Sequence, residues 1–351
     1  MDELIKLDGS HNEGGGQILR TALALSILTQ TPFTIDKIRQ NRPQPGLKAQ
    51  HLHCIKALLE LTNNKAKVIG AELGSTKLDF FPAEIVKSKL DIDIGTAGSI
   101  TLLLQSLLPC LVLRHKRTHL TITGGTDTKW SPLFDYLKEV IIPQFSRYAK
   151  IELNLLKRGF YPKGNGKVEI KINPYKLEKF QEVNLTEQGE LIHICGRSFS
   201  SKELMNAKVA ERQADSAKKY LLEKLNGFFH ININAEYNDT LSIGTCITLW
   251  AIFKDKADNI IRLGSDALGE KGTSSEEVGK EAAQKLVNEI NSKAPVDVHL
   301  ADNLIPVLGI VGGKIKVSEI SNHTLTNIYT TELFIEKKFN VDKENRIISV
   351  D

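Results

Sequence analysis

Residues 90–112 read LDIDIGTAGSITLLLQSLLPCLV and combine a short strand, a glycine-containing turn and an apolar helix. We expect the strand over Leu90–Ile94, the turn over Gly95–Gly98 and the helix over Ser99–Val112. The apolar run inside this helix is much shorter than the about 20 residues that a membrane span needs. It therefore indicates a buried core helix of an α/β protein.

The same succession of strand, turn and helix occurs elsewhere in the chain. The first copy covers residues 3–81 and the second covers 90–172, each with two helices and four strands. A third, shifted copy has a helix over 300–310, a strand over 314–320, a helix over 325–335 and two short strands. These patterns predict an α/β (α+β) fold with three βαβαββ repeats. Chance similarity of ordinary α/β patterning is the alternative.

The spacing of the repeats breaks between about residues 180 and 275. A strand, a polar helix over 205–225 and two further strands indicate a compact βαββ unit in this stretch. We therefore predict a small α/β domain inserted at 181–274, and a core formed by 1–180 together with 275–351.

Composition and charge exclude several classes of protein. Of 351 residues, 41% are hydrophobic and 25% are charged, which is typical of a globular protein and excludes disordered and fibrous chains. A net charge of +4 is too small for a nucleic-acid coat protein but permits a local basic site. The four cysteines form no CxxC pair, which argues against a zinc ribbon or a disulfide framework and favours a reducing cytoplasm. Neither a signal peptide nor a membrane partner is expected.

The segment DGSHNEGGGQILR, residues 8–20, is the first candidate site. Three consecutive glycines contribute no packing, so they indicate that a ligand approaches the backbone closely. They precede an apolar helix, whose free N–H groups and dipole suit an anion such as phosphate. Glu13 and Arg20 lie on either side of Gln17, a combination that fits a phosphate-bound divalent cation. The alternative is a flexible turn with a solvated Arg20.

The segment RQNRPQPGLKAQH, residues 39–51, is the second candidate. It follows a strand and leads into a helix, the position at which α/β proteins commonly bind ligands. The guanidinium groups of Arg39 and Arg42 match phosphate oxygens, and Gln50 and His51 follow one helical turn later. A polyphosphate or an RNA phosphate is the favoured ligand, and a solvated charged face is the alternative.

Two histidines begin helices near the C-terminus. His299 starts the segment HLADN, and His323 lies in SNHTLTN, where Ser321 or Asn322 can cap the helix. A neutral imidazole beside bound phosphates is a competent nucleophile towards phosphorus. The chain contains no GxxxxGK[ST] loop, no GxGxxG after a strand, no HExxH and no GxSxG. The candidates therefore indicate phosphate chemistry without a P-loop.

Taken together, these motifs resemble those of the RNA 3′-terminal phosphate cyclases along almost the whole chain. The resemblance implies three βαβαββ repeats like those of the translation initiation factor 3 C-terminal domain, with a small inserted α/β domain. It rests on six ordered segments, LDGSHNEGGGQILR (7–20), IRQNRPQPGLKAQH (38–51), IGTAGSITLLLQ (94–105), ITGGTDTKWSP (122–132), HLADN (299–303) and SNHTLTN (321–327).

The resemblance also implies an activity in three steps, with ATP, a divalent metal (Mg²⁺ or Mn²⁺) and an RNA that ends in a 3′-phosphate. A histidine Nε2 attacks the α-phosphorus of ATP, which releases pyrophosphate and leaves a histidyl-AMP. AMP then passes to the RNA 3′-phosphate. Finally, the neighbouring 2′-OH attacks the activated phosphorus, so that AMP leaves and a 2′,3′-cyclic phosphate remains.

Residue by residue, the resemblance implies that His323 is adenylated and that Glu13 binds the metal. It implies that the ATP phosphates and the RNA end are bound by Gln17, Arg20, Arg39, Arg42, Gln50 and His51. It implies further ATP contacts at Gln105, Pro132, Tyr136, His299, Leu300, Ala301, Asp302 and Asn303. Asn303 stands where bacterial members have Gln, and His299 stands where some members have Tyr.

Two other functions fit related patterns. Cyclase-like proteins that lack the adenylated histidine act as binding factors in ribosome assembly, whereas this chain retains His323 together with Arg20 and Arg42. A transferase of the enolpyruvyl type, built from similar repeats, would need substrate clusters that this sequence does not contain. We therefore favour the cyclase.

Overall fold

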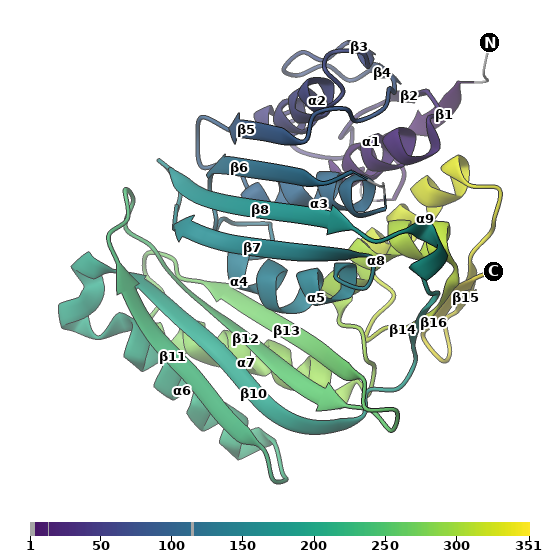
Figure 1. The fold of residues 1–351 in the computed structure, drawn as a ribbon. Helices are drawn as coiled ribbons and strands as arrows, with labels where there is room; N and C mark the ends of the chain where they lie inside the picture. The colour runs from purple at the N-terminus through teal and green to yellow at the C-terminus, as the bar shows by residue number, and fades with distance from the viewer. Residues whose placement is uncertain (1–3, 13, 114–115) are drawn as a thin grey trace.

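The computed structural model describes residues 4–12, 14–113 and 116–351, which form a mixed α/β fold (Figure 1). Their strands form four four-stranded sheets. Three of these sheets share one pattern, in which the first strand pairs in parallel with the second, and the fourth pairs antiparallel with both the second and the third. The α/β fold class predicted from the sequence is confirmed.

The three similar sheets each combine four strands with two helical segments. The first has β1 (Ile5–Asp8), α1 (Gln17–Thr29), β2 (Phe33–Asp36), α2 (Ala49–Leu61), β3 (Lys67–Ile69) and β4 (Leu78–Phe81). The second has β5 (Lys89–Asp93), α3 (Ile100–Val112), β6 (Thr118–Gly124), α4 (Phe134–Tyr136), the π-helical turn η1 (Leu137–Ile141), α5 (Ile142–Phe145), β7 (Ala149–Lys157) and β8 (Gly166–Pro174). The third has β9 (Val183–Leu185), α8 (Val298–Val311), β14 (Gly313–Lys316), α9 (Asn322–Phe334), β15 (Asn340–Asp342) and β16 (Ile347–Val350).

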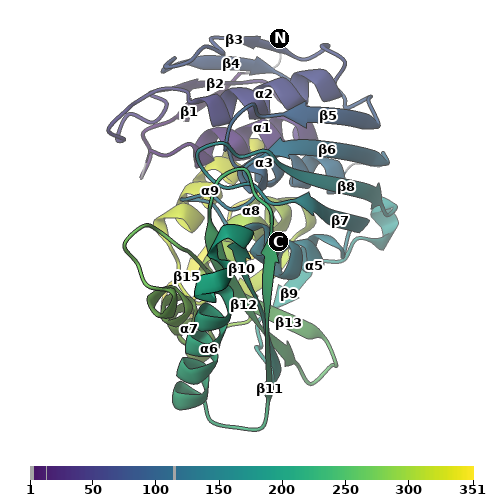
Figure 2. The ribbon, with the colours of Figure 1, turned by 90° about the vertical axis from the view of Figure 1, so that its left-hand side faces the viewer.

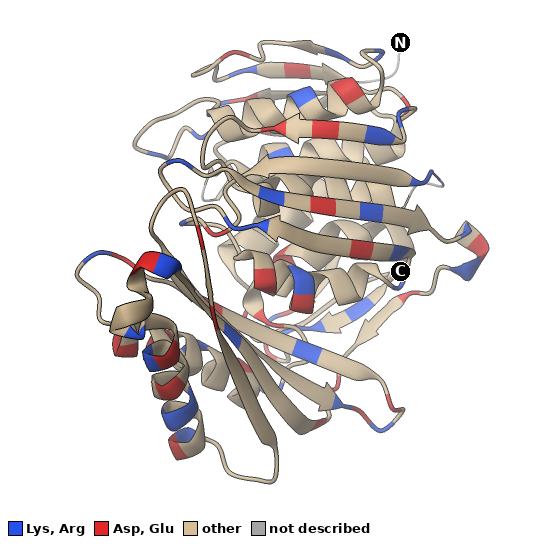
Figure 3. Ribbon diagram, turned by 60° about the vertical axis from the view of Figure 1, so that its left-hand side comes forward, with Lys and Arg blue, Asp and Glu red and all other residues tan. Residues whose placement is uncertain are grey.

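The helices of these three sheets meet in the middle of the core (Figures 1 and 2). Helix α1 packs against α3 and α9, and α8 packs against α9. A helix covered on several sides must be apolar nearly all round, which explains the apolar sequence of α3. Lys, Arg, Asp and Glu are spread over the strands and helices of the core and of the fourth sheet (Figure 3). No helix in the described part of the chain is long and apolar enough to cross a membrane.

The fourth sheet belongs to the inserted part of the chain. Its order is β11-β10-β12-β13, and helices α6 and α7 pack against each other and against this sheet. The other face contacts α4 and η1 of the core. The elements are β10 (Glu190–Ser201), the 3₁₀ segment η3 (Lys202–Ala207), α6 (Val209–Lys224), β11 (His230–Asn238), β12 (Thr245–Lys254), β13 (Ile260–Leu268) and α7 (Ser275–Asn291).

Several sequence-based details differ from the structure. The sequence suggested a βαββ unit, whereas the inserted sheet has a fourth strand, β13, and a second helix, α7. Strand β9, at 183–185, pairs with β14 of the core although it falls inside the predicted insertion of 181–274. The helix expected over 132–148 is interrupted by the π-helical turn η1. From these pairings we propose that the inserted unit spans 190–291.

A buried ionic network of the core is joined to the inserted unit by Arg197. Arg158 is only 4% exposed, and it contacts Asp127 at 2.9 Å and also Asp135. Arg197 of β10 binds the other oxygen of Asp135 at 2.7 Å. Burial opposes the charge of Arg158, but the two carboxylates outweigh this effect and hold the pKa of the guanidinium above its usual value. Each buried charge is therefore compensated.

Replacement of Arg158 by Met tests this network. The change would leave two buried carboxylates without their shared cation, so we expect a loss of about 3 to 5 kcal/mol in the free energy of unfolding, measured by urea denaturation. Arg212→Met is the matched control, because Arg212 makes an exposed pair with Glu276 at 2.7 Å and its loss should have little effect. Equal losses in the two variants would contradict a structural role for the buried pair.

Candidate active site at the helix N-termini

The N-terminal ends of five helices, α1, α2, α3, α8 and α9, are connected by polar contacts. Hydrogen bonds run from α2 to α3, from α3 to the segment before α4, from α4 to the cap of α8, from α9 to α8 and between α9 and α1. The start of α2 also lies directly against Gly16, which precedes α1. Helix N-termini carry unpaired N–H groups and partial positive charge. The arrangement therefore gathers donors that suit an anionic ligand such as phosphate.

His323 and Gln17 form the contact between α9 and α1. The carbonyl Oε1 of Gln17 contacts Nδ1 of His323, and the Nε2 amide of Gln17 donates to the His323 backbone oxygen at 3.5 Å. Because a carbonyl oxygen can only accept, Nδ1 carries the ring proton. The lone pair of the neutral imidazole is then on Nε2, which is the atom that can attack phosphorus.

Asp302 fixes the start of α9 from α8. Its carboxylate accepts hydrogen bonds from the hydroxyls of Thr324, at 2.8 Å, and Ser321, at 3.4 Å. The Ser321 hydroxyl in turn accepts from the Thr324 backbone N–H, so Ser321 caps the helix. Asn327 donates to the backbone oxygen of Asp302 at 2.6 Å and accepts from the hydroxyl of Thr21 on α1 at 2.7 Å. The turn that carries His323 is therefore held from both neighbouring helices.

His51 brings the start of α2 against the glycine run. Its Nδ1 accepts the backbone N–H of Lys48 at 3.0 Å, so the ring proton is on Nε2. A Cβ at Gly16 would overlap this Nε2, which explains why only glycine fits there. Burial, and then the charges of Arg20 and Arg39, lower the pKa of His51 to about 3. His51 is thus a neutral donor at this site.

Two polar atoms of the site are buried without a hydrogen bond to the described residues. These are Nε of Arg20 on α1 and Oε1 of Gln105 on α3. Burial lowers the pKa of the Arg20 guanidinium. A buried donor without a partner is costly, so Arg20 indicates that a ligand completes its contacts.

The loop before α2 uses its two arginines differently. Arg39 donates to the backbone oxygens of Gln44 and Gly46, at 2.8 and 3.2 Å, and so closes its own loop. Arg42 lies against the glycine run, since a Cβ at Gly15 would be 3.2 Å from its Nη2. Arg42 is therefore the better candidate of the two for binding a phosphate, whereas Arg39 stabilises the loop.

The remaining predicted residues lie on α2, on α3, on the segment before α4, on α4 and on α8. Gln50 donates to the backbone oxygen of Ser99 at 3.0 Å, and Thr101 donates to that of Pro132 at 2.7 Å. Tyr136 is fully buried, and the edge of its ring faces His299, with the centroids 6.1 Å apart. The predicted positions 50, 132, 136 and 299 thus lie along one connected path.

Asp297 was not predicted from the sequence, although it closes this path. It caps α8 by accepting the backbone N–H groups of His299 and Leu300, at 3.1 and 2.9 Å. It also accepts from the hydroxyl of Tyr136 and from the backbone of Gly264 in the inserted unit, the latter at 2.9 Å. An Asp directly before a helix is a cap signal, and that signal could have identified it.

Three positions of the HLADN segment have side chains that are buried or bonded within the fold, and their predicted ATP contacts stay predictions. The side chains of Leu300 and Ala301 are wholly buried in the core, and the Asn303 amide donates to the backbone oxygen of His299 at 2.8 Å. Glu13, the predicted metal ligand, lies outside the described residues. Within the described part of the chain, no group of three or more His, Cys, Asp or Glu side chains could hold a metal ion.

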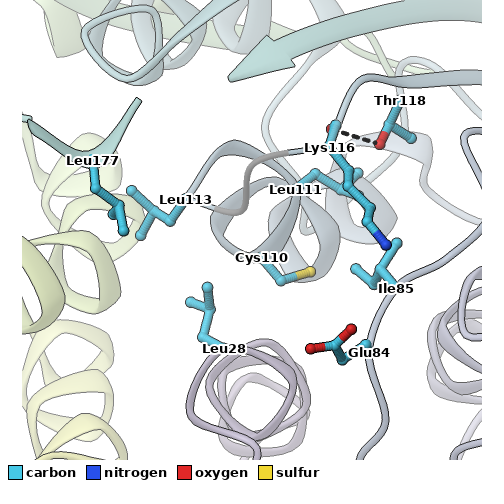
Figure 4. Close-up of a pocket in the computed structure, with 9 residues that line it drawn as sticks. All are labelled: Leu28, Glu84, Ile85, Cys110, Leu111, Leu113, Lys116, Thr118 and Leu177. Carbon is cyan, nitrogen blue, oxygen red and sulfur yellow. Dashed lines mark hydrogen bonds between the residues drawn. The ribbon is translucent and has the colours of Figure 1, made fainter. Parts of the chain in front are cut away.

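A separate pocket of about 390 Å³ lies near the opposite ends of α1 and α3 (Figure 4). Leu28 of α1 and Cys110 of α3 line it, with Glu84 and Lys116 on connecting segments. None of the predicted site residues lines this pocket. Binding chemistry inferred for the helix N-termini therefore does not extend to it.

Asp302 gives the site a testable pH dependence. Burial raises the pKa of its carboxyl to about 7, whereas an unfolded Asp titrates near about 3.9. The folded state therefore keeps a proton that the unfolded state loses, and this contribution to stability decreases as pH rises from about 4 to 7. Asp302→Asn should flatten this part of the stability profile in urea denaturation, and the surface variant Asp215→Asn should not. An unchanged profile in Asp302→Asn would exclude the protonated carboxyl.

Comparison with known proteins identifies the family of this chain. The family model of the RNA 3′-terminal phosphate cyclases matches residues 11–341. The chain is 46% identical to the RNA 3′-terminal phosphate cyclase of Pyrococcus furiosus over 339 residues, which cover 96% of this chain and 95% of that protein. It is 40% identical to the protein of the same name from Methanosarcina acetivorans, with 99% of each chain covered. The chain belongs to the RNA 3′-terminal phosphate cyclase family.

Proposed function

We propose that this protein converts an RNA 3′-phosphate into a 2′,3′-cyclic phosphate, with ATP as co-substrate and His323 as nucleophile. The observation that carries the proposal is the contact between Gln17 and His323, which puts the ring proton on Nδ1 and the lone pair on Nε2. This arrangement suits attack on phosphorus. A pure binding factor would have no need for it.

In the first step, Nε2 of His323 attacks the α-phosphorus of ATP. A nitrogen–phosphorus bond forms, the bond to the bridging oxygen breaks, and pyrophosphate leaves with the electron pair. The ring gains positive charge in this step. Because the Gln17 carbonyl accepts a hydrogen bond from the Nδ1–H group, it stabilises the positive charge that develops on the imidazole.

The triphosphate would be bound by donors beside the glycine run. Arg20 has a buried Nε without a hydrogen bond to the described residues, and His51 directs its Nε2 proton towards the glycine run. A divalent metal, Mg²⁺ or Mn²⁺, with Glu13 and the substrate phosphates as ligands, would neutralise phosphate charge when bound.

In the second step, an oxygen of the RNA 3′-phosphate attacks the phosphorus of the histidyl-AMP, so that an oxygen–phosphorus bond forms, the nitrogen–phosphorus bond breaks and the electron pair returns to Nε2. In the third step, the neighbouring 2′-OH attacks the RNA phosphorus and loses its proton to solvent. The oxygen–phosphorus bond of the cyclic phosphate forms while the bond to the AMP oxygen breaks, and AMP leaves. Nucleophile and electrophile share one ribose, so proximity favours this step. Arg39, Arg42 and Gln50 are our candidates for holding the RNA end. The four free cysteines fit a reducing cytoplasm, which we propose as the compartment.

His323→Asn is the direct test of the nucleophile. With α-labelled ATP and a divalent metal, the wild-type protein should acquire an acid-labile, alkali-stable label on a denaturing gel, and the variant should acquire none. His299→Ala is the matched variant, since His299 is exposed beside Tyr136, and its label should be weakened but retained. Full labelling of His323→Asn would refute the assignment. An unlabelled wild type that still binds ATP would favour the binding-factor class.

Loss of both Arg39 and Arg42 tests the RNA end. If these side chains hold the RNA 3′-phosphate, the double Ala variant should keep most of its histidine labelling while cyclisation falls by at least about tenfold, the equivalent of one charge-assisted contact. Arg42→Ala alone should account for most of the effect, because Arg39 is engaged with its own loop. Equal loss of labelling and cyclisation would instead place the two arginines on ATP.

A further inference from the structure

We propose that Trp130 and Tyr161 form a stacking surface for the bases of the nucleotides that precede the RNA 3′-phosphate. The inference rests on the proposed function, because it assumes an RNA substrate at the helix N-termini. Trp130 is 93% exposed and Tyr161 is 77% exposed. Large aromatic side chains with so little cover indicate a binding surface when they lie beside a functional site.

The backbone of Trp130 supports a role for its exposure. Trp130 has φ at 61°, in the left-handed region that bulky residues rarely adopt. Such a conformation costs free energy and tends to be retained at ligand-binding positions. The ring is nevertheless almost fully exposed, with the Nζ of Lys129 over it at 5.8 Å from the ring centroid. The fold therefore holds this indole in solvent at a cost in stability.

The two aromatic residues are carried by adjoining loops. Thr126 donates from its backbone to the Gly159 oxygen at 2.9 Å, and Asp127 forms a parallel bridge with Phe160. Trp130 and Tyr161 each follow these contacts within a few residues. The loops are therefore held together at their bases.

The same two loops border the candidate active site. Two residues after Trp130, the oxygen of Pro132 accepts from Thr101 at the start of α3. The loop of Tyr161 lies on the turn before α3, because a Cβ at Gly164 would be 2.6 Å from the Thr96 oxygen. An RNA whose last phosphate is at the helix N-termini would thus leave the site beside these loops.

A small hydrophobic cluster forms the floor of this surface. It consists of Leu133, Phe160, Phe199 and Cys246, all buried, and it is separate from the main core. A third loop, from the inserted unit, joins it through a hydrogen bond from the Lys163 backbone to the Ser242 hydroxyl at 3.0 Å. A rigid base of this kind reduces the entropy lost when a ligand stacks on the exposed rings.

The charge around the aromatic residues suits a nucleic acid strand. Lys157, Lys163 and Lys167 are exposed, and none makes an ion pair with another described residue. Lys129, next to Trp130, is paired with Glu270 at 2.7 Å. Proteins that bind single strands combine such cations for the phosphates with aromatic rings for the bases. A single-stranded RNA is therefore favoured over a protein partner.

Tryptophan fluorescence gives a direct measurement. The chain has two tryptophans, of which Trp250 is only 8% exposed. Titration with a 3′-phosphorylated oligoadenylate of about eight nucleotides, within the length that one binding groove covers, should quench the Trp130 emission. Binding of a dye-labelled oligoadenylate of the same length should weaken about tenfold in Trp130→Ala, as expected for the loss of one stacked base, and little in Trp130→Phe. Phe228→Ala is the control, because Phe228 is also fully exposed but lies at the start of β11.

Substrate length separates this proposal from the proposed function. A 3′-phosphorylated dinucleotide would be too short to reach both rings. The Trp130→Ala variant should therefore cyclise this dinucleotide at the same rate as the wild type. Histidine labelling should also be the same in both proteins. Unaltered RNA affinity in the Trp130→Ala, Tyr161→Ala double variant would overturn the proposal. So would a change in self-association without a change in RNA affinity, which would indicate a protein interface. Absence of cyclisation in the wild type would contradict only the proposed function, since RNA binding is measured separately.

Discussion

The gathering of helix N-termini in one place is the constraint on which the rest of the site depends. Each N-terminus has unpaired N–H groups and partial positive charge, so several of them together repel one another unless acceptors or anions lie between them. In this protein, part of the demand is met by Asp297, Asp302 and Ser321, which cap or brace α8 and α9. Around the glycine run, Arg20 and His51 instead add donors. The donors around the glycine run therefore lack acceptors, and an anionic substrate such as a triphosphate would supply them.

The inserted unit is attached to the same polar path. Asp297 receives hydrogen bonds from Tyr136 in the core and from Gly264 in the inserted sheet. The second attachment is the contact of Arg197 on β10 with Asp135 of the core, which also binds Arg158. Both attachments lie next to the segment that carries Pro132. The position of the inserted unit is therefore coupled to the geometry of the α8 N-terminus. A domain that moved freely relative to the core would have no such coupling.

The sequence predicted the fold class because strand, glycine turn and helix recur with similar spacing. The sequence predicted the elements less accurately where an element is short or where its partner lies far away along the chain. Strand β9 has only three residues, too few for a periodic signal, and its partner β14 lies about 130 positions later. Helix α7 was not predicted, although it begins with a capping box at Ser274 and Glu277, which is a sequence signal for the start of a helix.

The candidate site was predictable to the extent that its residues fall in compact motifs. Gln17, His51, Asp302 and His323 lie in four separate segments, and the structure joins them through neighbouring helices. The buried partners Asp127, Asp135 and Arg158 are ordinary charged residues in the sequence, since only burial gives them their role. Leu300 and Ala301 lie in the same motif as Asp302, yet their side chains are buried in the core. For Glu13, the metal assignment remains a prediction.

The account depends most on which nitrogen of His323 reacts. Nuclear magnetic resonance of protein with isotope-labelled histidine, before and after reaction with ATP, would identify the protonated nitrogen and the nitrogen bonded to phosphorus. The contact with Gln17 predicts a proton on Nδ1 in the free protein and phosphorus on Nε2 in the adenylated protein, with both signals perturbed in Gln17→Met. Phosphorus on Nδ1, or an adduct on another histidine, would contradict the account.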